Sequence, residues 1–231
     1  MTKHLDPRVI KTRSSLKTAL ISLMQQYKIE NISVQKITET AHITRGTFYL
    51  HYKDKRDFIS RAMTEILDDF FDAVIIDGTT MLPAEYSFLD GKDVDILSLN
   101  TAFSYIESEA QMFSVLLNTQ ENGLFEHQLN ERLTHLLEEF HNLLNPVFMD
   151  ISVPVNIQIA FVVSAYVGLI KNWLSEGMIY TPHYMTSSVK KMIALVQTDG
   201  QDRVTFTNFF HTEPEFAGQP QTTSWQTARR L

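Results

Sequence analysis

Apolar residues recur every three or four positions over most of this chain, which is the spacing of an amphipathic α-helix. The spacing is most regular between positions 58 and 74, where nine apolar residues fall on helical positions without a miss. Asp54 precedes this run as a helix cap, and Asp57 supplies an acidic residue in the first turn. The sequence therefore predicts a long helix that begins just after Asp54.

Three shorter helices are predicted upstream of this one. Residues 8–27 carry one apolar stripe with basic residues off it, and Asp6-Pro7 is a suitable start. Ser33 and Thr44 each precede a short apolar-periodic stretch as an N-cap flanked by apolar staple residues. The two short helices are so close that a tight turn must join them. Such a pair, with a second helix rich in small, polar and basic residues, is typical of a helix-turn-helix.

Downstream, residues 77–94 gather glycine, proline and aspartate, which indicates a loop and a change of module. No segment alternates polar and apolar residues convincingly before Arg203 to Phe210. For residues 198–231, which are polar with scattered aromatics, two alternatives stay open: an extension without a fixed place, or a segment laid over the helices. We expect an all-α fold, with later helices at about 95–119, 124–144, 155–176 and 182–197.

The composition is that of a globular protein, with 231 residues, 44% of them hydrophobic, and no cysteine. The lack of cysteine excludes disulfide scaffolds, thiol catalysis and Cys-ligated metal centres. The longest nearly uninterrupted apolar stretch, residues 159–170, is shorter than the roughly 20 residues of a membrane-spanning helix. The first residues lack the apolar region of a secretory signal. We therefore expect a soluble, cytoplasmic protein with no membrane partner.

Charge is distributed unevenly along the chain. Residues 1–62 carry twelve Lys or Arg against five Asp or Glu, a net charge of +7, whereas the other 169 residues carry eight against 22, a net charge of −14. Contact with phosphates that does not depend on sequence needs clustered cations of this kind. The basic N-terminal part is therefore expected to meet a polyanion, and a solvated charged face is the alternative.

Residues 37–55 read ITETAHITRGTFYLHYKDK. This stretch resembles the DNA-binding signature of the TetR family of bacterial transcription regulators, in which a helix-turn-helix is followed by Gly-x-apolar-Tyr-x-His-aromatic and by a lysine that opens the fourth helix. The resemblance covers roughly residues 8–75 and assigns Phe48 and Tyr52 to the core of the small domain. It departs at His42, where the family usually has the turn glycine, but histidine tolerates a positive φ better than most side chains.

The resemblance implies a three-helix DNA-binding domain followed by a helical domain that binds a ligand and dimerises. It implies a regulator, usually a repressor, that binds a pseudopalindromic operator in double-stranded DNA as a homodimer and is released by a small-molecule effector. The implied organisation is a helix-turn-helix domain at 1–53, a connecting helix at 54–76, an effector-binding and dimerisation domain at 77–198, and a polar C-terminal extension at 199–231.

The residue types of the second short helix suit contact with DNA. Arg45 can bond guanine, Gly46 lets the helix approach the duplex, and Leu50 can meet a thymine methyl group. Lys55, with the free amides of the next helix, would form a second phosphate site. The candidate DNA-contacting residues are Ser33, Thr44, Arg45, Gly46, Thr47, Tyr49, Leu50, His51 and Lys55.

Two further sites are expected in the helical domain. The apolar stretch 159–170 carries Ser164 and Gly168 four positions apart, which lets another helix come close. With the helix at 182–197, it resembles half of the four-helix dimer interface of TetR proteins; a central core helix in a monomer is the alternative. Aromatic and Met residues that could line an effector pocket are Phe103, Tyr105, Met112, Phe113, Phe125, Phe140, Tyr166 and Trp173.

Sequence features of enzymes are missing. Consecutive glycines are never closer than Gly168 and Gly177, so neither a P-loop nor a dinucleotide loop is present, and no two histidines stand three or four apart as in a helical zinc motif. We expect no cofactor, no catalytic residues and no metal site. Two other functions are alternatives: an activator or coactivator of the same fold that works through a protein partner, and an enzyme built in the helical domain.

Overall fold

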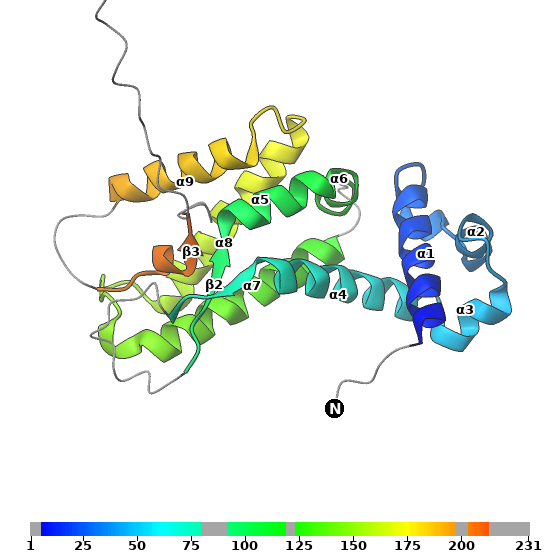
Figure 1. Cartoon of the computed structure of the whole chain (residues 1–231), viewed down its shortest axis with the longest axis horizontal. Helices are drawn as coiled ribbons and strands as arrows, with labels where there is room; N and C mark the ends of the chain where they lie inside the picture. Colours follow the sequence, from blue (N-terminus) through cyan, green and yellow to red (C-terminus); the bar gives the residue numbers. More distant parts are fainter. Residues whose placement is uncertain (1–5, 80–91, 119–122, 197–202, 213–231) are drawn as a thin grey trace, which may run out of the picture.

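Three N-terminal helices, α1 (Pro7–Met24), α2 (Val34–Thr40) and α3 (Arg45–His51), cluster at one end of the molecule, and α4 (Lys55–Val74) runs from them into the remaining helices (Figure 1). The structure, a computed structural model, describes residues 6–79, 92–118, 123–196 and 203–212. We call α1–α3 the N-terminal unit. A short 3₁₀ helix, η1 (Ile29–Asn31), lies between α1 and α2.

The predicted helix caps are confirmed. Each cap side chain accepts a hydrogen bond from a backbone N–H two or three residues further along, which satisfies one of the free donors of the first turn. The caps therefore fix where each helix starts. They are Asp6 for α1, Ser33 for α2, Thr44 for α3 and Asp54 for α4.

The turn between α2 and α3 is a Schellman motif centred on His42. This residue has a φ of 55°, as expected for the position where the family has glycine. The His42 N–H donates to the carbonyl of Glu39 at 3.2 Å, and the Ile43 N–H donates to the carbonyl of Thr38 at 3.0 Å. These two bonds satisfy carbonyls that the end of α2 leaves free. The turn thus keeps its geometry without glycine.

Helix α4 buries the apolar stripe that the sequence predicts for it. All nine apolar positions between 58 and 74 are buried. The helix packs against α5 and α7 as well as carrying the N-terminal unit. Its apolar stripe therefore forms part of the core from one end of the helix to the other.

Among the described residues beyond α4, which we call the body, five α-helices and a short 3₁₀ helix, η4 (Asn145–Val147), precede residue 197. The predicted single helix at 95–119 is wrong in two respects: its first four residues form a strand, and the helix breaks at Glu109. The other three helices predicted in the body begin and end within about one residue of the observed ones. The helices are α5 (Leu99–Ser108), α6 (Ala110–Asn118), α7 (Gly123–Leu144), α8 (Val155–Ser175) and α9 (Pro182–Val196).

A small sheet not expected from the sequence lies among the helices of the body, where it contacts α5 and α7 (Figure 1). Its strands follow the order β1 (Ile75–Asp77), β2 (Asp95–Ser98) and β3 (Phe210–His211). The β1–β2 pair is antiparallel and the β2–β3 pair is parallel. Strands of two to four residues are too short to show a period of two, so sequence patterning could not reveal them.

Residues 203–212, which we call the C-terminal segment, are laid over the body, which decides between the two alternatives for this part of the tail. Val204 exchanges backbone hydrogen bonds with Val147 and Met149 at 3.1 and 2.8 Å. Phe209, in the 3₁₀ helix η5 (Phe206–Phe209), is fully buried. Residues 213–231 lie outside the described residues.

Helix α8 is long and apolar, with 21 residues and a mean hydropathy of 1.4 over its most apolar part, of which 28% is buried. By length and composition alone it could cross a membrane, and core helices of other proteins meet the same criterion. The uninterrupted apolar stretch at 159–170 is thus only part of the apolar length of this helix. One face of α8 is open, with Ile157 54% and Phe161 75% exposed.

Replacing Phe209 by alanine should lower the free energy of unfolding by about 3–5 kcal/mol, because a fully buried ring is removed and a cavity is left. Denaturant unfolding measures this loss. Leu50→Ala, at a side chain that is 82% exposed, is the control and should change stability by less than about 0.5 kcal/mol. An unchanged unfolding midpoint for Phe209→Ala would mean that the C-terminal segment is not part of the fold.

Candidate nucleic-acid interface

Helix α3 turns nearly all of its surface outward. Phe48 is its one buried residue, whereas Tyr49 is 56% and Leu50 82% exposed. A leucine this exposed gains nothing from the chain's own core. The exposed face of α3 is therefore available to a partner.

An aromatic cluster holds α3 against the start of α4. The rings of Phe48 and Phe58 lie 5.5 Å apart, and those of Tyr52 and Phe58 lie 4.8 Å apart, both in edge-to-face geometry. Burial, with the charge of Glu65, raises the pKa of Tyr52 to about 12. Phe48 and Tyr52 thus belong to the core, as the resemblance implied, and α3 is fixed in orientation.

Arg45 lies on the exposed surface at the start of α3. Its guanidinium donates a hydrogen bond to the side-chain oxygen of Gln35, and the side-chain nitrogen of Gln35 donates to Glu39 at 2.8 Å. Two residues of α2 thus orient the arginine of α3. Sequence reasoning missed Gln35, because only the turn geometry brings positions 35 and 45 together.

The hydroxyl groups of Ser33 and Thr44 act first as helix caps. The Thr44 Oγ1 accepts a hydrogen bond from the Thr47 N–H at 3.0 Å and lies 2.9 Å from the Thr47 Oγ1. Ser33 accepts from the Lys36 N–H at 3.2 Å. A cap uses a lone pair of the oxygen, so the hydroxyl hydrogen can still be donated to a phosphate.

Gly46 is not required by packing within the chain. A Cβ placed on it would meet the Thr44 Oγ1 at 3.6 Å, an ordinary contact. Glycine inside a helix costs about 1 kcal/mol relative to alanine. A glycine that the fold does not need, on an exposed helix, suits a surface that another molecule approaches closely.

Lys55 does not have the free ammonium that the phosphate-site hypothesis needs. Its Nζ donates to the carbonyls of Ile29, Glu30 and Ile32 at 3.0, 3.2 and 3.0 Å. An ammonium has three hydrogens, and these three carbonyls take all of them. We therefore correct the expectation: Lys55 fastens the α1–α2 connection to the start of α4.

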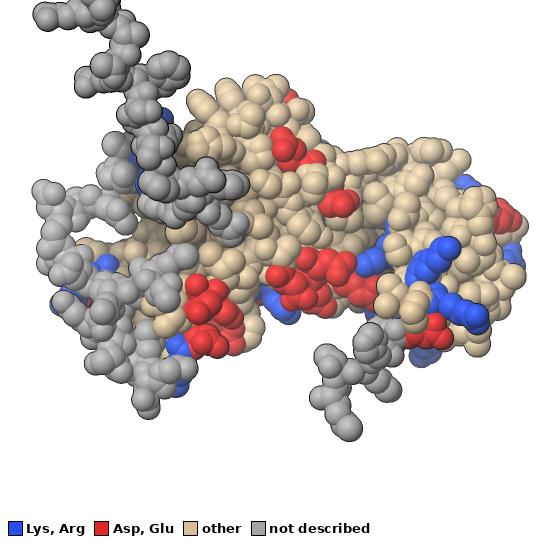
Figure 2. Space-filling view, viewed as in Figure 1, with Lys and Arg blue, Asp and Glu red and all other residues tan. Residues whose placement is uncertain are grey.

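Exposed cations near α3 remain available. Lys53 and Arg56 are exposed, and neither takes part in a side-chain ion pair within the described residues. The neighbouring Asp57 carboxyl is held by other groups: the backbone N–H of Lys53 and then the guanidinium of Arg61 keep its pKa below the usual value. Figure 2 shows Lys and Arg gathered over the N-terminal unit and the largest acidic area over α4 and α7. Lys53 and Arg56 are thus additional candidates that the sequence analysis counted only as charge.

Two family models match this chain. Residues 18–62 match the model described as bacterial regulatory proteins, tetR family, and residues 97–195 match a model of TetR regulators described as transcriptional regulator C-terminal region. Together they cover more than half of the chain. The chain belongs to the TetR family. It is a transcriptional regulator with a DNA-binding helix-turn-helix domain. The C-terminal segment, residues 203–212, lies beyond both matched ranges.

Individual relatives agree with this assignment. The Bacillus subtilis protein named uncharacterized HTH-type transcriptional regulator YxbF is 24% identical over 194 residues, which are 79% of this chain and 44% of that protein. The chain thus spans less than half the length of this curated relative. A TetR transcriptional regulator from Streptococcus agalactiae 2603V has a TM-score of 0.56 at 19% identity, covering 83% of this chain and 96% of that one. The dihydroxyacetone kinase operon activator DhaS has a TM-score of 0.50 at 18% identity, covering 81% and 97%.

The aromatic residues expected to line an effector pocket of this TetR protein lie in separate groups. The rings of Phe103 and Trp173 meet at 5.4 Å, whereas the Phe113 ring contacts those of Phe125 and Tyr105, each at 6.1 Å. Their role as the lining of an effector pocket stays a prediction. Two other candidates contact the C-terminal segment: Phe140 meets Phe209, and Tyr166 meets Phe210. Tyr105 and Met112 line a cleft beside α1.

The two residues expected at the dimer interface, Ser164 and Gly168, are exposed on α8. A Cβ placed on Gly168 would meet nothing within 4 Å among the described residues. Nearby, the Lys171 ammonium pairs with the Glu126 carboxylate at 2.7 Å, which links α8 to α7. The small residues of α8 therefore face away from the chain's own core.

Lys55→Ala should lower the free energy of unfolding by about 1–3 kcal/mol, because three carbonyls lose a charged donor. Lys53→Ala should leave stability unchanged and lower the slope of log affinity for DNA against log salt by about one. Thermal unfolding and DNA titration at several salt concentrations measure the two effects. The reverse result, with a stable Lys55→Ala variant of reduced salt slope, would restore Lys55 as a phosphate contact.

Proposed function

We propose that this TetR-family regulator is a homodimeric, cytoplasmic repressor that binds a pseudopalindromic operator and is released by a small-molecule effector. The observation that carries the DNA-binding half is the exposed face of α3, with Leu50 82% exposed beside Arg45 and Gly46. In this proposal residues 1–53 bind DNA, 54–76 connect, and the body binds effector and dimerises. The C-terminal segment belongs to the body.

The proposed division of labour on DNA follows from residue chemistry. Arg45 bonds the O6 and N7 of guanine, and Leu50 contacts a thymine methyl group. Gly46 lets α3 enter the major groove closely. Phosphates and nearby base edges are contacted by the hydroxyl, phenol and imidazole groups of Ser33, Thr44, Thr47, Tyr49 and His51, and Lys53 and Arg56 add charge.

The open face of α8 supports a dimer. Ile157, Phe161, Ser164 and Gly168 follow one another at spacings of three or four and are all exposed. A core helix in a monomer would be buried all round, whereas 28% of the apolar part of α8 is buried. A second copy packed on this face would bury the exposed side chains, and the small residues would let the two helices approach.

A symmetric dimer explains how an effector would act. The two α3 helices must enter major grooves about 34–36 Å apart, or a multiple of this distance. An effector that fits a dimer with another spacing shifts the population away from the DNA-competent state, by as much as its affinities for the two states differ.

An activator or coactivator that works through a protein partner is the second candidate. Three exposed apolar side chains at the α8–α9 connection favour it: Ile179 is 69% exposed, and the exposed Tyr180 and Tyr184 stack at 4.8 Å. Transcription in a purified system separates the two: a repressor lowers transcription alone, whereas a coactivator changes it only when its partner is added. The family and fold are those of transcriptional regulators, which gives the enzyme hypothesis no support.

Selection of genomic fragments by the purified protein, at about 50 and 200 mM salt, tests the proposed function. We expect one pseudopalindrome to be enriched, with affinity falling steeply as salt rises. Arg45→Ala should blunt discrimination at one base pair of each half-site by about 1–3 kcal/mol. Binding that depends on salt but prefers no sequence would contradict operator recognition.

Gly168→Leu should convert the dimer to a monomer, because a branched side chain would separate the two α8 helices. Gly123→Leu is a matched control, since a Cβ there also meets nothing within 4 Å in the described chain. Sedimentation velocity measures the oligomeric state of both variants. A Gly168→Leu protein that sediments like the unmodified dimer would contradict this interface.

A further inference from the structure

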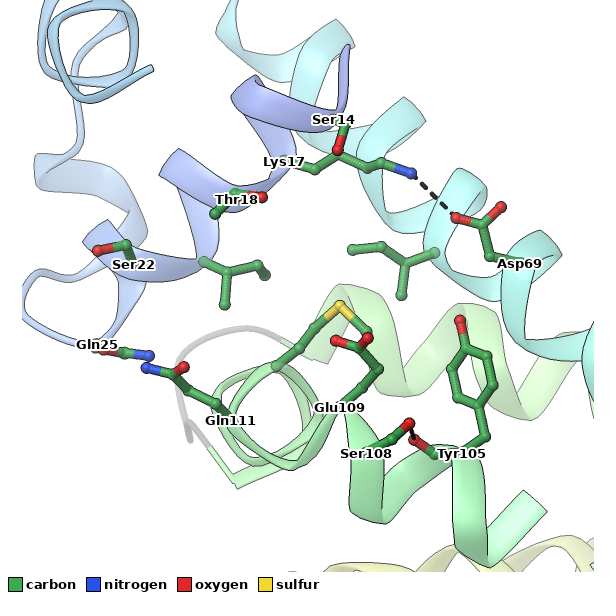
Figure 3. A pocket seen from close by; sticks show the side chains of 13 residues that line it. Ser14, Lys17, Thr18, Ser22, Gln25, Asp69, Tyr105, Ser108, Glu109 and Gln111 are labelled. Carbon is green, nitrogen blue, oxygen red and sulfur yellow. Dashed lines mark hydrogen bonds and ion pairs between the residues drawn. The ribbon is translucent and has the colours of Figure 1, made fainter. Parts of the chain in front are cut away.

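A cleft of about 590 Å³ lies where the N-terminal unit meets the body (Figure 3). Its walls come from α1, α4 and the corner between α5 and α6. The volume falls within the range of small-molecule sites. Tyr105 and Met112, two of the residues expected in an effector pocket, line it, and the Tyr105 ring also contacts the buried Phe113 at 6.1 Å.

The cleft has an apolar floor and a polar rim. Ile21 and Ile66 are buried and Met112 is half-buried, so they offer a surface for the apolar part of a ligand. Hydroxyl and amide groups surround this floor, and in Figure 3 the side chains of Gln25 and Gln111 approach each other from opposite walls. A ligand with both apolar and hydrogen-bonding parts therefore suits the cleft.

The charges of the lining favour a cation. Lys17 is the cleft's basic side chain, and its ammonium already pairs with Asp69 at 3.1 Å and with Glu65 at 3.6 Å. Glu109 points into the cleft in Figure 3, and its carboxylate has no ion pair within the described residues. Burial raises the pKa of Tyr105, and the charges of Asp69 and Glu109 raise it further. Both carboxylates therefore act on the Tyr105 hydroxyl group.

We propose that this cleft is the effector site and that it binds a small organic cation, an amine or quaternary ammonium with an apolar body. The cationic group lies beside the Glu109 carboxylate and the Tyr105 ring, where ion pairing and cation–π attraction add. The apolar body lies on Ile21, Ile66 and Met112. This assignment rests on the proposed function for its effect on DNA binding, but not for binding itself.

The position of the cleft gives the ligand its effect. α1 belongs to the unit that contacts DNA, whereas Glu109 belongs to the body. A ligand that touches both favours one angle between them, and a dimer requires one spacing of its two α3 helices on the operator. Cation binding and operator binding are then coupled, and the coupling is equal in both directions.

Benzyltrimethylammonium, titrated into the full chain in a calorimeter, tests the site. We expect one cation bound per chain and at least ten-fold weaker binding of neopentylbenzene, a neutral molecule of the same shape. Glu109→Gln should weaken cation binding at least five-fold, whereas Glu107→Gln, an exposed residue of α5 outside the cleft, should leave it unchanged. Ser22→Trp, which fills the cleft from the exposed side of α1, should abolish it.

The same variants, assayed on the selected operator with and without saturating cation, separate the two proposals. Absence of binding at millimolar cation, or binding that Glu109→Gln and Ser22→Trp leave unchanged, would overturn the cleft as a site. Cation binding in the cleft that leaves operator affinity unchanged would overturn its role as the effector site. Loss of operator selectivity in the protein without cation would instead contradict the proposed function.

Discussion

The two parts of this molecule share one apolar element, helix α4. Its 20 residues extend over about 30 Å, and its buried stripe runs from the aromatic cluster under α3 to the core of the body. Any movement of the N-terminal unit relative to the body must therefore bend α4 or shift its packing. Ion pairs from α1 to Glu65 and Asp69 lie along the same helix, but they are partly exposed and contribute less than the apolar contacts.

The small N-terminal unit depends on polar groups as much as on its core. Four side-chain caps, the Schellman turn at His42 and the three bonds of Lys55 satisfy backbone groups that short helices leave free. With the backbone satisfied in this way, α3 needs to bury only Phe48. The rest of its seven-residue surface is then free for the DNA contact proposed above.

The body is completed by residues that lie far from the other core residues in the chain. The family match ends at residue 195, yet the C-terminal segment puts Phe206, Phe209 and Phe210 into the core and adds a strand to the sheet. Phe210 stacks on Tyr166 at 3.7 Å. The C-terminal segment thus packs directly on α8, and the cleft lined by α1, α4 and the α5–α6 corner lies elsewhere.

The sequence by itself determined most of the helices and their caps, because these depend on residues within one or two helical turns. It predicted all nine buried positions of α4, the positive φ at His42 and the outward residues of α3. Tertiary structure alone decided that Lys55 binds carbonyls 23 to 26 positions away, that Gln35 orients Arg45, and that residues 97–98 pair with 210–211. Tertiary structure also decided where the cleft lies, because its walls come from α1, α4 and the α5–α6 corner. These contacts join segments distant in sequence, and no local spacing encodes which distant partner will meet them.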